Sequence, residues 1–179
     1  MKVFVINGFP GSGKTTMEEY CVNYLNQFDK YKNKVHIISS IDSVKQIAKQ
    51  IGWNGVKTAE DRKFLSDLKK LLKNYNDFPY KSVKRKIIRA VYRDSKDSEN
   101  HVIFIDSREP EEIKRFKKDF KAKTVCIRRK ELENRIWSNE SDSNVLKTKY
   151  NIYISNDGSI EDFKKNINVF LESEVLNND

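Results

Sequence analysis

The residues most suited to chemistry stand near the start of the chain, in Gly8-Phe9-Pro10-Gly11-Ser12-Gly13-Lys14-Thr15. They fit the spacing G-x-x-x-x-G-K-[ST], in which glycines let the backbone wrap closely and turn its N–H groups toward phosphate oxygens. Lys14 is then placed to reach the β- and γ-phosphates, Thr15 to bind Mg²⁺ and Thr16 to donate to an α-phosphate. The residues predicted to bind a nucleoside triphosphate are Gly11, Ser12, Gly13, Lys14, Thr15 and Thr16.

The segments beside this loop are those that such chemistry requires. An apolar run, residues 3–6, ends just before the loop, and an amphipathic pattern follows it, so the positive N-terminal end of a helix faces the same anion. A glycine-rich turn that fits the spacing by chance would not have this context. Another apolar run, residues 102–105, ends in Asp106, whose carboxylate suits Mg²⁺, directly or through water. An Asp at a strand end is also a common cap or turn residue.

Five short apolar runs alternate with longer amphipathic segments, and they cover residues 3–6, 35–38, 102–105, 125–127 and 152–154. Their Val and Ile content with little polar alternation is typical of strands buried on both faces, and the alternation predicts a parallel sheet with helices on both sides. Ser43 with Gln46 fits a capping box, and Thr58 and Ser159 each precede an acidic turn. A longer helical stretch, residues 43–94, exceeds a plain crossover and suits a cap over the site.

Length and composition indicate one globular domain over residues 1–179. The net charge of +9 is typical of nucleic-acid-binding proteins, but lysines scattered over several helices also suit solvated faces that attract small anions, and we favour this second interpretation. Cys21 and Cys126 lie in helical and strand patterns, as core thiols of a reducing compartment do. The first apolar run is too short for a signal peptide or a membrane span, so we expect a cytoplasmic protein without a membrane partner.

Three stretches resemble the nucleoside monophosphate kinase group of P-loop kinases. GFPGSGKTT is similar to their phosphate loops, and residues 105–112, IDSREPEE, resemble the D-x-R-x-P-x-E pattern of bacteriophage-type deoxynucleoside monophosphate kinases. Residues 153–162, YISNDGSIED, resemble the final strand and loop of those enzymes and of dephospho-coenzyme A kinases. The resemblance implies an α/β, three-layer αβα P-loop kinase fold. Its five-stranded parallel sheet has the order 2-3-1-4-5, with a helical acceptor-side insert (43–94) and a candidate lid (129–149).

The same resemblance implies a function. It predicts an ATP-dependent kinase that uses Mg²⁺ and passes the γ-phosphoryl group to a small acceptor, foremost a (deoxy)nucleoside monophosphate. It places Asn156 and Gly158 near the adenine of ATP. The D-G-F-P-R segment of adenylate kinases and the D-R-[YH] element of thymidylate kinases are absent, so the acceptor base stays open. Residues 33–36, NKVH, lack the Asp of the guanine-binding N-K-x-D element, which argues against a GTPase.

Two alternatives remain beside the nucleotide kinase. One is a P-loop kinase for a hydroxyl acceptor such as a nucleoside or a nucleic-acid 5′ end, which the basic charge and Asp42 favour. The other is a module that binds a nucleotide without useful catalysis. The partners expected are small nucleotides, with nucleic acid less favoured, and the chain is a monomer or a homodimer.

Arginines are the remaining candidates, because phosphoryl transfer is mostly positioning and charge neutralisation. Arg128 and Arg129 follow the fourth apolar run, at the sheet edge where α/β proteins bind ligands. Arg135 lies in the candidate lid. These three and Lys14 form the candidate catalytic set. The alternative is that the arginines are surface residues paired with Glu131, Glu133 or Glu140.

On the acceptor side, Asp42 follows the second apolar run and is either a general base for an alcohol or a helix-capping residue. The candidates to hold an acceptor phosphate are Arg62, Lys84, Arg85 and Arg108. Arg108 is the strongest of them, because it lies two residues after Asp106. Trp53 either stacks on a base or fills the core.

Overall fold

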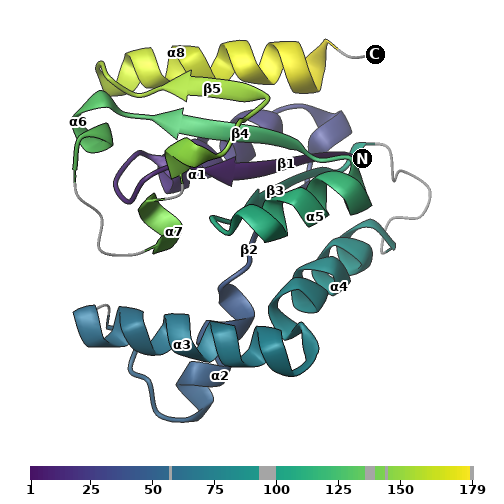
Figure 1. Cartoon of the computed structure of the whole chain (residues 1–179). Helices are drawn as coiled ribbons and strands as arrows, with labels where there is room; N and C mark the ends of the chain where they lie inside the picture. The colour runs from purple at the N-terminus through teal and green to yellow at the C-terminus, as the bar shows by residue number, and fades with distance from the viewer. Residues whose placement is uncertain (57, 93–99, 136–139, 144, 178–179) are drawn as a thin grey trace.

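The computed structural model describes residues 1–56, 58–92, 100–135, 140–143 and 145–177 (Figure 1). In this part of the chain five parallel strands form one sheet. They are β1 (Lys2–Asn7), β2 (Val35–Ser39), β3 (Val102–Asp106), β4 (Lys123–Arg128) and β5 (Ile152–Ser155). Their order is β2-β3-β1-β4-β5, which confirms the predicted topology. All five carboxyl ends therefore point to the same edge of the sheet, and the phosphate loop follows the central strand there.

Helices cover both faces of this sheet (Figure 1). They are α1 (Lys14–Leu25), α2 (Asp42–Gln50), α3 (Ala59–Asn76), α4 (Phe78–Tyr92), α5 (Pro110–Phe120), α6 (Lys130–Glu133), α7 (Glu140–Ser143) and α8 (Ile160–Leu171). Shorter turns are η1 (Asp29–Tyr31), η3 (Val145–Lys147) and η4 (Glu172–Leu176). The predicted helical stretch 43–94 is seen as α2, α3 and α4, and residues 93 and 94 lie outside the described residues.

The two faces of β1 bury different side chains, as a strand in the middle of a three-layer fold must. Phe4 and Ile6 pack with residues of α1 and α8 on one face. Val3 and Val5 pack with residues of α4 and α5 on the other. The core is thus divided into two layers by the sheet, and each layer fixes helices that lead to or from the carboxyl edge.

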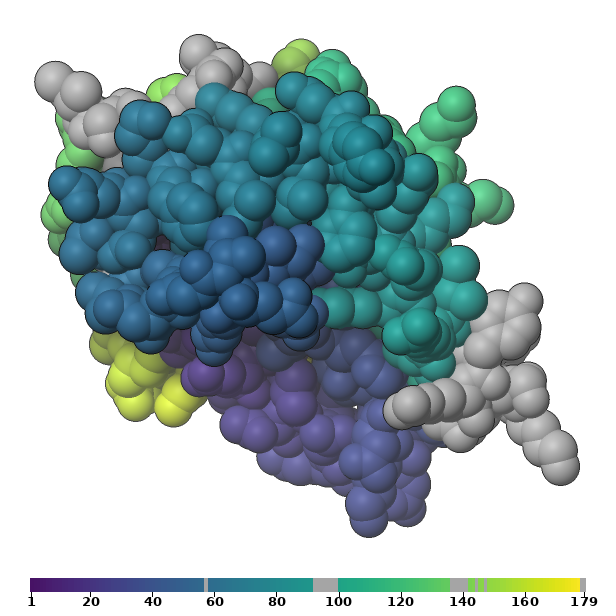
Figure 2. Space-filling model, turned by 90° about the horizontal axis from the view of Figure 1, so that it is seen from below, coloured from purple at the N-terminus to yellow at the C-terminus, as the bar shows by residue number. Residues whose placement is uncertain are grey.

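Helices α2, α3 and α4 form a connected layer below the sheet in Figure 1, and Figure 2 shows their surface as one continuous face. The chain turns from α3 into α4 at Asp77, whose φ of 58° is left-handed. Two hydrogen bonds from Arg115 on α5 to the Asp77 carboxylate, of 2.9 and 2.6 Å, hold this corner. In the described part of the chain, no helix is both long and apolar enough to cross a membrane.

The capping residues predicted from the sequence can be compared with the observed first residues of the helices. Thr58 and Ser159 each form a capping box, with Asp61 and Asp162 as the third helical residue, so both predicted starts are confirmed. The box predicted at Ser43 is wrong. Helix α2 already begins at Asp42, whose carboxylate accepts the Ser39 N–H at 3.2 Å, and Ser43 is buried inside the first turn.

Candidate active site

The phosphate loop leaves β1 and bends tightly between Gly8 and Gly13. A side chain at Gly8 would place its Cβ 2.5 Å from Ser12 Oγ and 2.7 Å from the Ile127 carbonyl oxygen. At Gly13, with a φ of 103°, a Cβ would lie 2.6 Å from Asn156 Nδ2. Glycine is therefore required at both positions, by space at the first and by backbone conformation and space at the second. The bend brings the loop onto the N-terminus of α1, where the first N–H groups have no partner within the helix.

Lys14 lies inside this loop instead of extending into solvent. Its Nζ donates to the carbonyl oxygens of Gly8 at 2.6 Å and Phe9 at 3.0 Å, and the residue is only 8% exposed. Burial, with the charge of Arg108 as the next cause, lowers its pKa to about 8, and the charge of Asp106 opposes this shift. The ammonium is therefore still mostly protonated at neutral pH, close to carbonyl groups that an anionic phosphate oxygen can replace.

The loop also connects to the last loop of the sheet. Asn156 Nδ2 donates to the Ser12 carbonyl oxygen at 2.8 Å, and its backbone N–H donates to the Arg128 carbonyl oxygen, also at 2.8 Å. The resemblance predicted Asn156 near the nucleotide, and the structure places it against the phosphate loop itself. Gly158 lies in the turn before Ser159, where an added Cβ would be 3.0 Å from Asp162 Oδ2.

The two predicted metal ligands lie on neighbouring elements. Thr15 and Thr16 are exposed in the first turn of α1, and Asp106 ends β3, half-buried, with Ile6 of β1 beside it in the sheet register. The backbone oxygen of Asp106 accepts the Ser40 N–H at 3.1 Å, and its charge acts on Lys14. A hydroxyl and a carboxylate are the hard oxygen donors that Mg²⁺ prefers. Ser12 Oγ is fully buried and has no hydrogen-bond partner among the described residues, as expected for a group that faces a ligand.

Arg108 is the predicted acceptor-side cation whose charge acts on Lys14. Its charge is the strongest charge acting on Lys14, which places the two cations near one another. Arg108 Nη1 donates to Asp142 Oδ1 on α7 at 2.6 Å, and Asp142 is 7% exposed. The guanidinium is therefore at the site but held by a carboxylate of the candidate lid.

The three lid-side arginines differ from one another. Arg128 makes two hydrogen bonds to Glu133, at 2.7 and 2.8 Å, and lies over the Tyr153 ring. It is therefore paired at the surface with Glu133, which is the alternative to a catalytic role. Arg129 pairs with Glu131 at 3.0 Å and also donates to the Gly11 carbonyl oxygen at 3.4 Å, which places it at the phosphate loop. Arg135 is exposed next to residues 136–139, which lie outside the described residues.

The other acceptor-side candidates are spread over the helical layer. The Asp42 carboxylate accepts the Ser39 N–H and lies 3.5 Å from Lys86 Nζ of α4. Arg62 is exposed on α3, and Arg85 is exposed on α4, where it donates to the Lys81 carbonyl oxygen of its own helix. Trp53 is half-buried and donates to the Val56 carbonyl oxygen at 3.0 Å and to Asp61 at 3.1 Å. The structure thus brings Asp42 to the strand edge and leaves Arg62 and Arg85 on exposed helix faces.

Glu18 is a site residue that sequence reasoning missed. It lies one helical turn after Lys14 on the same face of α1, is 6% exposed, and its Oε1 has no hydrogen-bond partner among the described residues. Burial raises its pKa to about 8, with repulsion from Asp106 as the next cause, whereas Lys14 opposes the rise. The sequence did contain a signal for Glu18. It stands four residues after Lys14 in the same helix, and residues i and i+4 share a helix face.

A buried ion pair that also escaped prediction holds the helical layer to the strand edge. Lys69 of α3 lies 3.0 Å from Glu112 of α5 and donates to Ser40 Oγ at 3.3 Å. Ser107 Oγ donates to the same Glu112 carboxylate at 2.8 Å. Ser40 follows β2 and Ser107 follows β3, so one lysine connects α3 with both strand ends.

The candidate lid is anchored at both ends near the phosphate loop. Phe9 packs with Cys126, Leu132, Val145 and Tyr150 in a small buried cluster. Asn7 Nδ2 donates to the Tyr150 hydroxyl at 2.8 Å, and that hydroxyl donates to the Val145 carbonyl oxygen at 3.0 Å. Residues 136–139 and 144 of the candidate lid lie outside the described residues.

Comparison with solved structures agrees with this fold. Dephospho-CoA kinase from Campylobacter jejuni superposes with a TM-score of 0.51 and 20% identity, covering 97% of this chain and 98% of that chain. Thymidylate kinase from Ehrlichia chaffeensis is also similar, with a TM-score of 0.49 and 13% identity, covering 96% of this chain and 97% of that chain. So is shikimate kinase from Bacteroides thetaiotaomicron, with a TM-score of 0.48 and 14% identity, covering 96% of this chain and 97% of that chain. The likeness to the first shows that the chain has the fold of P-loop kinases. No protein-family model and no curated protein sequence matches it.

Proposed function

We propose that the chain is an ATP-dependent kinase whose preferred acceptor is a (deoxy)nucleoside monophosphate, as its resemblance to bacteriophage-type deoxynucleoside monophosphate kinases implies. The observation that carries the proposal is the buried Lys14 ammonium, held by the Gly8 and Phe9 carbonyl oxygens in the phosphate loop. The charges of Arg108 and Asp106 also act on this ammonium. Two cations at one site suit the charge that builds up between a donor triphosphate and an acceptor phosphate. Dephospho-CoA kinase, whose fold the chain shares, is by its name also a kinase.

The residues divide into two groups in this proposal. On the donor side, Gly11, Ser12 and Gly13 form the loop and Lys14 exchanges its carbonyl partners for the β- and γ-phosphates of ATP. Thr15 and Asp106 would hold Mg²⁺, which neutralises phosphate charge when bound. Arg129, beside Gly11, approaches the same phosphates, and Asn156 and Gly158 support the nucleotide.

On the acceptor side, Arg108 binds the acceptor phosphate once Asp142 releases it. Arg62, Arg85 and Arg135 remain lower-ranked candidates, with Arg135 contributing from the lid. Asp42 favours a phosphate acceptor over an alcohol, because its carboxylate already accepts from Ser39 and pairs with Lys86 and so serves the structure of the strand edge. We keep the predictions of a cytoplasmic protein that is a monomer or a homodimer.

One assay separates the proposal from its alternatives. The protein is incubated with Mg-ATP and a panel of (deoxy)nucleoside monophosphates, nucleosides and 5′-hydroxyl oligonucleotides, and ADP is followed. We expect rapid ADP formation with one monophosphate. Turnover only with a nucleoside or an oligonucleotide would contradict the proposal in favour of a hydroxyl acceptor. ATP binding without any acceptor dependence would favour a nucleotide-binding module.

A further inference from the structure

Helix α4 has an unusual charge. Its sequence, FPYKSVKRKIIRAVY, carries Lys81, Lys84, Arg85, Lys86 and Arg89 and not one carboxylate. Its neighbour α3 mixes five cationic with three acidic residues in AEDRKFLSDLKKLLKNYN, as a solvated helix usually does. A run of cations without acids concentrates positive potential along one helix, which attracts polyanions.

The cations of α4 lie on different faces of the helix from its buried residues. Tyr80, Val83 and Ile87 are buried against the sheet. Lys81 and Arg85, four residues apart, are exposed on the opposite side, so both point away from the core. Lys86 lies on another side of the helix, where it meets Asp42.

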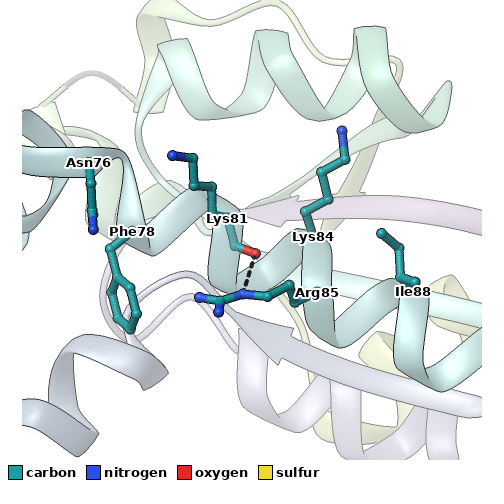
Figure 3. A pocket seen from close by; sticks show the side chains of 6 residues that line it. All are labelled: Asn76, Phe78, Lys81, Lys84, Arg85 and Ile88. Carbon is teal, nitrogen blue, oxygen red and sulfur yellow. Dashed lines mark hydrogen bonds between the residues drawn. The ribbon is translucent and has the colours of Figure 1, made fainter.

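The exposed face of α4 is hollowed into an open groove of about 610 Å³, lined by Asn76, Phe78, Lys81, Lys84, Arg85 and Ile88 (Figure 3). In Figure 3, Arg85 runs back along the helix and donates to the Lys81 carbonyl oxygen, while Lys81 and Lys84 extend to the other side. The Arg85 guanidinium lies 5.7 Å from the centre of the Phe78 ring. Lys84 forms an ion pair with Asp119, with 3.3 Å between Nζ and Oδ2. Lys81 and Arg85 are therefore the principal cations of the groove.

We infer that this groove binds single-stranded nucleic acid, with phosphates on Lys81 and Arg85 and a base on Phe78. A groove that combines cations with an aromatic ring is the arrangement by which single strands are held without sequence preference. From Phe78 to Ile88 the helix rises by roughly 15 Å at 1.5 Å per residue, which is longer than one nucleotide. A duplex offers no free base faces to Phe78, and a mononucleotide would use only part of the groove.

Binding is tested without turnover, by fluorescence anisotropy of a labelled 12-nucleotide oligodeoxythymidine at several salt concentrations. We expect Lys81→Gln/Arg85→Gln to weaken binding about 25-fold at 0.1 M salt, and to reduce the salt slope by about 1.4, since each single-strand phosphate contact contributes roughly 0.7. Lys164→Gln/Lys165→Gln on α8 is the matched control, because it removes the same charge from a helix on the other face of the sheet (Figure 1). Equal weakening by the two double variants would overturn the groove as a site, as would the absence of binding by the unaltered chain.

Three further measurements test where the strand binds and whether the ligand is a nucleic acid. An abasic strand of the same length should bind more weakly, by roughly 5- to 150-fold for each stacked base lost. Equal affinity for that strand would overturn the assignment of a base to Phe78. Lys14→Ala should leave oligonucleotide affinity unchanged, and a loss in that variant would place the strand at the phosphate loop instead. Binding to phosphatidylserine vesicles but not to the oligonucleotide would likewise overturn the inference in favour of a membrane surface.

Discussion

Arg108, two residues after the end of β3, is hydrogen-bonded at 2.6 Å to Asp142 in the candidate lid. This pair connects the strand edge with a helix more than thirty residues away in the sequence. The Asp142 carboxylate accepts a hydrogen bond from the Arg108 guanidinium, and an acceptor phosphate would accept from the same donors. Acceptor binding and lid position are therefore expected to depend on one another.

The first prediction concerns this competition. Asp142→Asn keeps the shape of the side chain but removes its charge, so we expect the KM for the acceptor to fall about fivefold, the effect of roughly 1 kcal/mol for a partly exposed ion pair. Arg108→Ala should raise the same KM, because the cation itself is lost. Steady-state kinetics with saturating ATP provides both values. A higher KM in Asp142→Asn would show instead that the pair persists with the acceptor bound.

The second prediction concerns Lys14. Lys14→Ala should reduce the transfer rate by at least about a hundredfold, as removal of one group that stabilises transition-state charge typically does. The fold should persist, because the buried ammonium is itself a desolvated charge. Single-turnover rates, with circular dichroism as the check on folding, measure both. An active Lys14→Ala protein would be incompatible with the proposed mechanism.

The third prediction concerns the anchor between Lys69 and Glu112. Lys69→Met leaves the Glu112 carboxylate buried without its cation and should lower the free energy of unfolding by about 3 kcal/mol. Lys63→Met on the same helix removes an exposed pair with Asp67 and should have no measurable effect. Urea unfolding compares the two variants. If they behave alike, the Lys69 pair does not hold the helical layer.

The fourth prediction concerns pH and Glu18. The folded protein holds the Glu18 proton up to a pKa of about 8, whereas the unfolded chain releases it near 4.5. The folded state thus binds more protons in this window, and the free energy of unfolding contributed by Glu18 falls as pH rises from about 4.5 to 8.

Glu18→Gln removes that dependence, so its stability relative to the unaltered chain should rise by about 3–4 kcal/mol between pH 5 and pH 8. Urea unfolding of both proteins at the two pH values measures this difference. Parallel pH profiles for the two proteins would show that Glu18 is not buried as a neutral acid.

The sequence was sufficient to predict those features whose physical cause lies within a few neighbouring residues. The phosphate loop follows from glycines at fixed spacing, and Thr58 and Ser159 cap helices because their partners lie three residues away. The same reasoning was wrong at Ser43, because Asp42 also suits a helix start and the chain turns one residue earlier. Strand burial on both faces predicted a parallel sheet, and the kinase resemblance predicted the order of its strands.

The contacts that escaped prediction connect residues far apart in the chain. Lys69 and Glu112 are separated by 43 positions, and no local pattern marks which of many lysines is buried. Glu18 looked like one of several acidic helix residues, and only the packing of α1 on the sheet shows that it is desolvated. Arg128 and Arg129 are adjacent, yet Arg128, the last residue of β4, binds Glu133, whereas Arg129, which follows the strand, contacts Gly11.

The cluster around Phe9 has a consequence for how the site responds to a nucleotide. The ring belongs to the phosphate loop, but Leu132, Val145 and Tyr150 shield it from water. Withdrawing those side chains would expose an aromatic surface whose burial is worth roughly 1.5–3 kcal/mol. Ordering of the loop by ATP should therefore slow amide hydrogen exchange at residues 145 and 150 as well, at a distance from any phosphate.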